Sequence, residues 1–197
     1  MRNTAFFIAG VVMLLVQSNL FRLIAVVLHL IGWVVRAKHD IVIVSFHGGA
    51  EGNGAEVLPF AREIFAGEDR GNVVEFARSM IDAGADIVLG HGPHVVRPME
   101  IYRDRLIAYS LGNFATYYGI SVEGIRGLAP ILLVTLDDQG RFVSGRVEAT
   151  TQIRPSGPSP DPSRGVIKLL QTLTATAFPD GELSIGDDGM LARRASP

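Results

Sequence analysis

The sequence predicts a mixed α/β domain, because two short β-branched runs alternate with a helical pattern. The runs cover residues 41–46 and 86–89, and each ends in a loop rich in glycine and histidine. Continuous apolar runs of this length are typical of strands buried on both faces of a parallel sheet. A strand, a helix and a second strand in this order predict a parallel pair joined by a crossover. The 197 residues suffice for one ordinary domain.

The helix between the two runs has a start signal and a stop signal. Asn72 is expected to cap its first turn, and Glu75 three residues later completes a capping-box pattern. Gly84 is expected just beyond its end, where a left-handed backbone favours glycine. The apolar stripe of this helix consists of Val73, Val74, Phe76, Ala77, Met80 and Ile81.

The pattern after this point is mostly β. Two hairpins are expected, over residues 99–102 with 106–109 and over residues 130–136 with 142–149. Residues 154–163 are rich in proline and predict a surface linker. A helix over residues 164–178, capped by Ser163, is expected to follow, and the rest of the segment 164–197 is a polar tail with one short strand at most.

Residues 1–38 differ from the rest, because they hold two apolar runs separated by a polar break. Each run is shorter than the roughly 20 residues that a membrane-spanning helix needs. Together they could form one imperfect span, and the first could instead be the apolar region of a signal sequence. A pair of buried helices is the third alternative. Membrane association is the interpretation that we favour. Basic residues flank both ends, so the orientation stays open.

Composition excludes several classes of site. The formal net charge is -2, so nothing suggests a concentrated basic face or a nucleic-acid partner. The chain has no cysteine. Disulfides, thiolate zinc sites and cysteine nucleophiles are therefore excluded, and a metal would depend on histidine, carboxylate or amide ligands.

Three histidines follow the two predicted parallel strands, His47 after the first and His91 with His94 after the second. The carboxyl ends of parallel strands lie at one edge of a sheet, where ligands bind in open α/β folds. Neutral imidazole is a good ligand for divalent transition metals. A single histidine in such a place is more often structural, so spacing alone leaves both interpretations open. Glu51 is likewise open as a ligand, a general base or a solvated loop carboxylate.

Three segments in order resemble the signatures of the CapA family of poly-γ-glutamate capsule biosynthesis proteins. They cover residues 40–51, 84–100 and 107–114, and the resemblance extends over about residues 39–150 of a predicted domain of residues 39–153. This family is similar in fold to the calcineurin-like metallophosphatases, which form a four-layer α/β/β/α sandwich around two metals. The resemblance implies the C-terminal, histidine-bearing half of such a sandwich, preceded by an apolar N-terminal helical segment.

The resemblance also assigns roles to individual residues. His47, His91 and His94 correspond to metal ligands, and the metals implied are divalent ions such as Mn, Fe, Zn or Mg. Glu51, Glu100 and Asn113 match recurrent positions of the family. We expect a catalytic role for Glu51 and contacts to the substrate from Asn113 and Glu100.

The N-terminal motifs of the family are missing from residues 1–38, where a Gly-Asp and an Asn-Asn-His element would stand. These motifs supply the acidic side of the site, so we expect a truncated or rearranged relative. Complete relatives imply metal-assisted hydrolysis or transfer at a phosphate or acyl centre, with an envelope polymer or a phosphate-containing substrate as partner. The expected place is membrane-associated, at the cell envelope. One alternative is a non-catalytic remnant or accessory partner in polymer assembly. Another is a soluble α/β domain whose N-terminus packs on the sheet.

Overall fold

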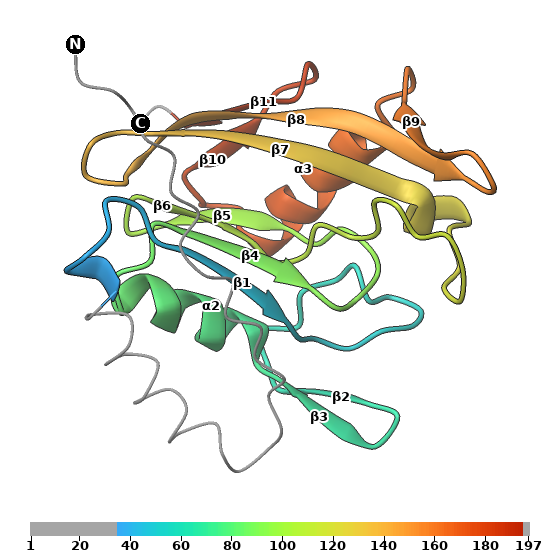
Figure 1. Cartoon of the computed structure of the whole chain (residues 1–197), viewed down its shortest axis with the longest axis horizontal. Coiled ribbons are helices and arrows are strands. Elements are labelled where there is room, and N and C mark those ends of the chain that lie inside the picture. The colour runs from blue at the N-terminus through green and yellow to red at the C-terminus, as the bar shows by residue number, and fades with distance from the viewer. Residues whose placement is uncertain (1–34, 195–197) are drawn as a thin grey trace.

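The protein is a mixed α/β domain, as the sequence predicts, and it has two main sheets (Figure 1). The structure, a computed structural model, describes residues 35–194. In chain order its elements are β1 (Ile43–His47), β2 (Glu63–Phe65), β3 (Glu68–Gly71), α2 (Val73–Asp82), β4 (Ile87–His91), β5 (Met99–Tyr102), β6 (Arg105–Ala108), the 3-10 helix η2 (Gly124–Gly127), β7 (Leu128–Leu136), β8 (Phe142–Ile153), β9 (Gly157–Pro160), α3 (Gly165–Ala177), β10 (Leu183–Ile185) and β11 (Met190–Arg193).

The first sheet has the strand order β1-β4-β6-β5. Strands β1, β4 and β6 are parallel, and β5 forms an antiparallel hairpin with β6. The two predicted strands are thus confirmed as a parallel pair, in a register that places His47 opposite His91. The connection between them contains α2 and also the small β2–β3 hairpin, which the sequence pattern did not predict.

Helix α2 covers one face of the first sheet (Figure 1). The Asn72 side chain accepts hydrogen bonds from the amides of Val74 and Glu75, which confirms the predicted cap. Gly84 has φ +106° just after the helix, a conformation that suits glycine. The six predicted stripe residues are all buried, and they pack with Val88 and other core residues of the sheet.

The second sheet has the order β10-β11-β8-β7, and β9 also pairs with β8. Helix α3 packs on β7, β8 and β10 and contacts β5 of the first sheet (Figure 1). The proline-rich segment 154–163 lies at the surface but contains β9, and the polar tail forms the β10–β11 hairpin. Ser163 does not cap α3. The Asp161 carboxylate accepts the amide of Gly165 instead.

The expected apolar N-terminal segment lies almost wholly outside the described residues. Among the helices of residues 35–194, none is long and apolar enough to cross a bilayer. The two sheets and the helices that pack on them confirm the mixed α/β class.

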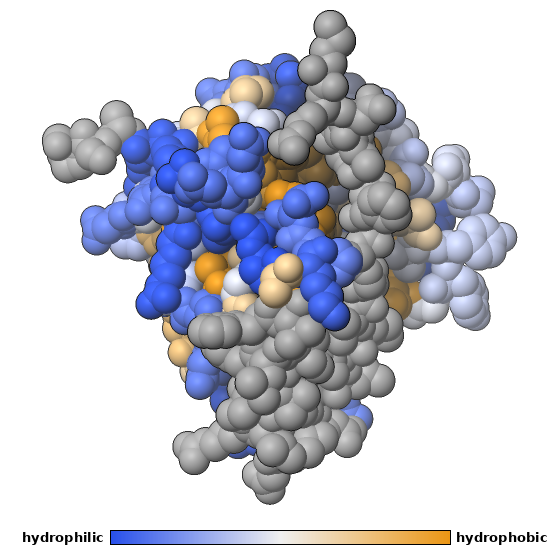
Figure 2. Space-filling model, turned by 60° about the vertical axis from the view of Figure 1, so that its left-hand side comes forward, coloured by the Kyte–Doolittle hydropathy of each residue, from blue (hydrophilic) through white to orange (hydrophobic). Residues whose placement is uncertain are grey.

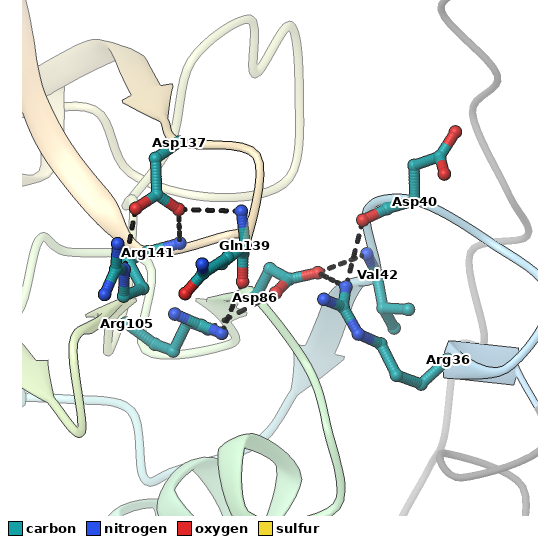
Figure 3. Close-up of polar contacts among 8 residues, drawn as sticks. All are labelled: Arg36, Asp40, Val42, Asp86, Arg105, Asp137, Gln139 and Arg141. Atoms are coloured by element: carbon teal, nitrogen blue, oxygen red, sulfur yellow. Dashed lines mark hydrogen bonds and ion pairs between the residues drawn. The ribbon is translucent and has the colours of Figure 1, made fainter.

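A buried carboxylate joins the amino ends of the parallel strands (Figure 3). The Oδ2 atom of Asp86 accepts from the Val42 amide at 2.9 Å and from Nη1 of Arg36 at 2.6 Å. Its Oδ1 lies 3.2 Å from Nε of Arg105. Nη2 of Arg105 in turn donates to the Gln139 carbonyl at 2.7 Å, in the turn between β7 and β8. Asp86 thereby connects the starts of β1, β4 and β6, and Arg105 extends this connection to the second sheet.

This cluster is densely packed although it lies near the surface. Gly140 has φ +74°, and a Cβ there would come within 1.8 Å of Oδ1 of Asp86. Figure 2 brings this end of the molecule forward and shows that its described part is mostly hydrophilic, with smaller hydrophobic areas between. Burial raises the pKa of Asp86 even though two guanidinium groups oppose the shift.

Candidate functional site

The three predicted histidines converge at the carboxyl edge of the parallel strands. His47 ends β1 and His91 ends β4, directly opposite each other. The His47 and His94 rings meet edge to face, with centroids 6.5 Å apart. The loops that carry them touch, because the Gly48 amide donates to the His91 carbonyl at 2.8 Å. At Gly92, which has φ +127°, a Cβ would lie 2.5 Å from the Gly48 carbonyl oxygen, so glycine is required for this approach.

Asn113 fixes the ring of His94. Its amide nitrogen donates to the carbonyls of His94 at 3.0 Å and Arg126 at 3.2 Å. The Asn113 Oδ1 atom is therefore the acceptor that faces Nδ1 of His94 at 2.9 Å, and we infer that Nδ1 carries the proton. His94 has φ +58°, an uncommon backbone conformation for a residue other than glycine. The same asparagine thus holds both the backbone and the tautomer of this histidine.

The Nε2 atom of His94 faces the carboxylate of Glu51. The distance from Nε2 to Oε2 is 3.8 Å. With the proton on Nδ1, both facing atoms carry lone pairs, so a proton or a cation between them would be favourable. Oε1 of Glu51 also lies 3.6 Å from Nη2 of Arg70, a residue of β3. The structure therefore brings together an imidazole, a carboxylate and a guanidinium at the edge of the sheet.

Burial keeps two of the imidazoles in their neutral form. The pKa of His47 is lowered mainly by burial, the neighbouring His94 and Arg70 lower it further, and Glu51 opposes the shift. Burial also lowers the pKa of His91, with a smaller effect from His47. Neutral imidazole is the form that binds metals, so the local electrostatics suit the predicted ligand role.

The described residues do not make a complete metal centre. Within residues 35–194, no group of three or more His, Asp or Glu side chains is placed to hold an ion. Glu51 is the carboxylate that contacts the histidine cluster, and Arg70 lies beside it. Two dications need several anionic oxygens to balance their charge. The residues present fit the histidine side of such a centre and do not fit a two-metal centre by themselves.

Glu100 lies apart from the histidines in its contacts. Its carboxylate accepts from Nε and Nη2 of Arg78 at 2.9 and 2.8 Å, and the Tyr109 hydroxyl donates to it as well. Burial raises the pKa of Tyr109, so this hydroxyl stays protonated. The partners of Glu100 thus tie β5 to α2, which is a structural arrangement. Asn113 and Glu51, in contrast, are both in direct contact with His94.

The site also contains a residue that the sequence pattern did not single out. Arg70 belongs to the unpredicted β2–β3 hairpin, and its carbonyl accepts the Gly49 amide at 3.0 Å. The only local signal was a charged run between Gly67 and Gly71, which is typical of a turn and does not indicate a site.

The central part of the chain is similar in sequence to known capsule synthesis proteins. Residues 29–118 match the family model described as bacterial capsule synthesis protein PGA_cap. The chain is 42% identical over 78 residues to the PGA biosynthesis protein CapA of Bacillus subtilis, covering 39% of this chain and 17% of that protein. It is 39% identical over 79 residues to the capsule biosynthesis protein CapA of Bacillus anthracis, covering 40% of this chain and 16% of that protein.

A third relative is a probable polyglutamine synthesis accessory protein of Mycobacterium tuberculosis, 38% identical over 109 residues, covering 53% of this chain and 25% of that protein. The chain therefore spans a quarter or less of the length of these three relatives. The resemblance to the CapA family is confirmed as a partial match that includes β1, α2, β4 and the loop of Asn113.

Proposed function

Because its central region matches the capsule synthesis family, we propose that the protein takes part in assembling a capsule or polyglutamate polymer at the cell envelope. Its chemistry would be metal-assisted hydrolysis or transfer at a phosphate or acyl centre. His47, His91 and His94 would bind a divalent ion such as Mn, Fe, Zn or Mg. Glu51 would act as the general base or general acid of this reaction.

One observation carries this proposal: Asn113 holds one side of the His94 ring by a hydrogen bond, and the Glu51 carboxylate faces the other side. A ring whose Nδ1–H is bound to a side-chain oxygen presents Nε2 in a fixed direction, which is typical of metal-binding and proton-transferring histidines. The carboxylate of Glu51 on the other side is a suitable proton acceptor. Neutral His47 and His91 beside it support the same role.

The family resemblance extends the proposal to the fold and to the location. We propose that α2 and the first sheet correspond to one outer and one inner layer of the four-layer sandwich, since α2 covers that sheet and the second sheet lies on the other side. Association with a membrane would depend on residues 1–38, whose composition is apolar. Fractionation of the full chain and of a variant without residues 1–34 tests this point. Recovery of both forms from the soluble fraction would contradict it.

Metal content of the purified full chain tests the chemical part. The wild-type protein is expected to retain a divalent ion through gel filtration and to cleave a generic phosphodiester. His47→Ala and His94→Ala should both lose the ion. His39→Ala is the matched control, because His39 is exposed and precedes β1. Unchanged metal content in the two site variants would show that the ligand assignment is wrong.

A second candidate is a non-catalytic accessory role in the same polymer assembly. The position of Arg70 favours it, because a guanidinium 3.6 Å from Glu51 opposes the binding of a dication. This role predicts that the protein binds poly-γ-glutamate in the presence of a chelator and cleaves no phosphodiester. Loss of polymer binding when the metal is removed would contradict it.

A further inference from the structure

Arg97 and Glu63 form a buried ion pair next to the loop that carries Glu51. The guanidinium donates from Nη1 to Oε1 at 2.8 Å and from Nη2 to Oε2 at 2.7 Å. The Arg97 side chain is 1% exposed and that of Glu63 is 6% exposed. Parallel N–H···O bonds of this kind fix the orientation of both groups as well as their distance.

The pair encloses the loop that carries Glu51. Arg97 donates from Nε to the Ala55 carbonyl at 2.6 Å and from Nη2 to the Ala50 carbonyl at 3.3 Å. Oε2 of Glu63 accepts the Ala50 amide at 2.8 Å. Both backbone groups of the residue before Glu51 are therefore held by the pair.

The loop passes directly over the guanidinium. Gly49 has φ +88°, and a Cβ there would lie 2.7 Å from Nη1 of Arg97. The backbone of Arg97 is itself fixed, because its amide donates to the Ser110 carbonyl at 3.0 Å. Arg97 follows His94 by three residues, so one side chain connects the His94 loop with the Glu51 loop.

Energetics argue against stability as the sole role of this pair. A buried ion pair loses the hydration of both charges, and well-packed apolar residues of similar volume are often as stable or more stable. An apolar pair would not make the directed hydrogen bonds to the backbone of Ala50 and Ala55. Those bonds determine the path of the loop on either side of Glu51.

We infer that Arg97 and Glu63 are positioning residues that set the place of Glu51 relative to Nε2 of His94. This inference rests on the proposed function only where it concerns metal binding. The positioning itself is a property of the loop and is measurable in the metal-free protein.

The double variant Arg97→Met/Glu63→Leu tests the positioning, because it removes both charges and approximately keeps the side-chain volume. In chelator-treated full chain, the imidazole nitrogen resonances of His94 should move toward those of Glu51→Gln, which removes the carboxylate and leaves the loop bonds intact. The Ala50 amide should exchange with solvent at least about tenfold faster. The matched control is Arg146→Met/Glu148→Leu, an ion pair on β8 that is about half exposed in both side chains.

Wild-type resonances for His94 and an unchanged Ala50 exchange rate in the double variant would overturn the inference. So would a Glu51→Gln spectrum identical to wild type, because His94 would then not sense Glu51. If the double variant does not fold, Arg97→Lys takes its place, since one ammonium group cannot make the paired bonds. In Arg97→Lys, where Glu63 can still accept the Ala50 amide, wild-type resonances of His94 would overturn the inference equally.

Zn²⁺ titration of the same proteins separates this inference from the proposed function. The positioning pair is expected to affect zinc affinity as outer groups of metal sites do, so binding to the double variant should be about tenfold weaker. A wild-type protein that binds no Zn²⁺ would contradict the proposed metal site, whereas the loop measurements would still decide the positioning. Equal Zn²⁺ affinity in wild type and in a variant with a loosened loop would overturn the functional part of the inference.

Discussion

The two ends of the parallel strands hold titratable groups in opposite ways. At the amino end, Asp86 pairs with Arg36 and Arg105 and accepts the Val42 amide, and both arginines also donate to backbone carbonyls (Figure 3). At the carboxyl end, His94 is held on one side of its ring only, and its Nε2 atom faces Glu51 across 3.8 Å. The amino end uses its charged groups to join strands, whereas at the carboxyl end the Nε2 atom of His94 accepts no hydrogen bond from Glu51 and faces its carboxylate.

Burial has the same physical effect at both ends and opposite consequences for charge. It disfavours the charged form, so it raises the pKa of Asp86 and lowers the pKa values of His47 and His91. At the amino end the cost is partly offset by two arginines. At the carboxyl end the result is a set of neutral imidazoles. This comparison indicates which substitutions should alter stability and which should alter the site.

The largest expected effect on stability is that of Arg97→Ala. It leaves the Glu63 carboxylate buried without its partner, and breaking a buried pair from one side typically costs about 4 kcal/mol. Urea unfolding followed by circular dichroism measures the loss. Arg146→Ala, at an exposed pair, is the control and should change the free energy of unfolding by less than about 0.5 kcal/mol. Equal effects of the two substitutions would mean that the carboxyl end does not depend on its buried pair.

Asp86→Asn should reduce the free energy of unfolding by about 2 kcal/mol, because the amide keeps an acceptor for Val42 but turns its NH2 group toward a guanidinium donor and leaves it buried without a partner. Metal content should not change. Since the folded protein binds this proton more tightly than the unfolded chain, wild-type stability falls as pH rises above the ordinary pKa of aspartate.

Asp86→Asn has no titratable group at this position. The difference in stability between wild type and Asp86→Asn should therefore shrink as pH rises from about 3 to about 6, measured by urea unfolding at each pH. A difference that grows over this range would show that the two arginines outweigh burial and that the direction of the pKa shift is wrong.

Local signals predicted the parallel strands, α2 and the place of the histidines. Asn72 and the apolar stripe define α2 within a few residues of sequence, and the end of a parallel strand determines which edge His47 and His91 share. Asn113 and Glu51 came from the family resemblance, and both contact His94. These placements could be inferred because each depends on neighbours in the sequence or on a motif that stays together in the fold.

Long-range pairing accounts for what the sequence did not reveal. Glu63 and Arg97 carry no local sign that they meet, because their pairing depends on how the loop before β2 folds back. The strand β9 lies in a proline-rich segment, which favours a linker on composition alone, yet it pairs with β8. Glu100 matched a family position, but its contacts are with Arg78 and Tyr109.

Tyr109→Phe tests whether Glu100 has a structural role. It removes the buried hydroxyl that donates to the carboxylate, while Arg78 keeps both of its bonds. The expected loss is about 1 kcal/mol in the free energy of unfolding, with metal content and phosphodiester cleavage unchanged. Thermal and urea unfolding measure the first quantity. A loss of cleavage without a loss of stability would return Glu100 to the substrate-binding role that the sequence resemblance implied.

The smallest effect, and the one that sharpens the comparison most, concerns acid stability. Because His47 and His91 have lowered pKa values, the unfolded chain binds their protons first, and stability is lost as pH falls below the ordinary histidine pKa. His47→Gln/His91→Gln should therefore show a shallower decline between about pH 6.5 and about pH 5 in chelator-treated protein, whereas exposed His39→Gln should match wild type. Equal slopes in all three proteins would mean that the carboxyl end does not hold its histidines neutral. The two ends of the sheet would then lose the opposite pH dependences that distinguish a buried aspartate from a buried histidine pair.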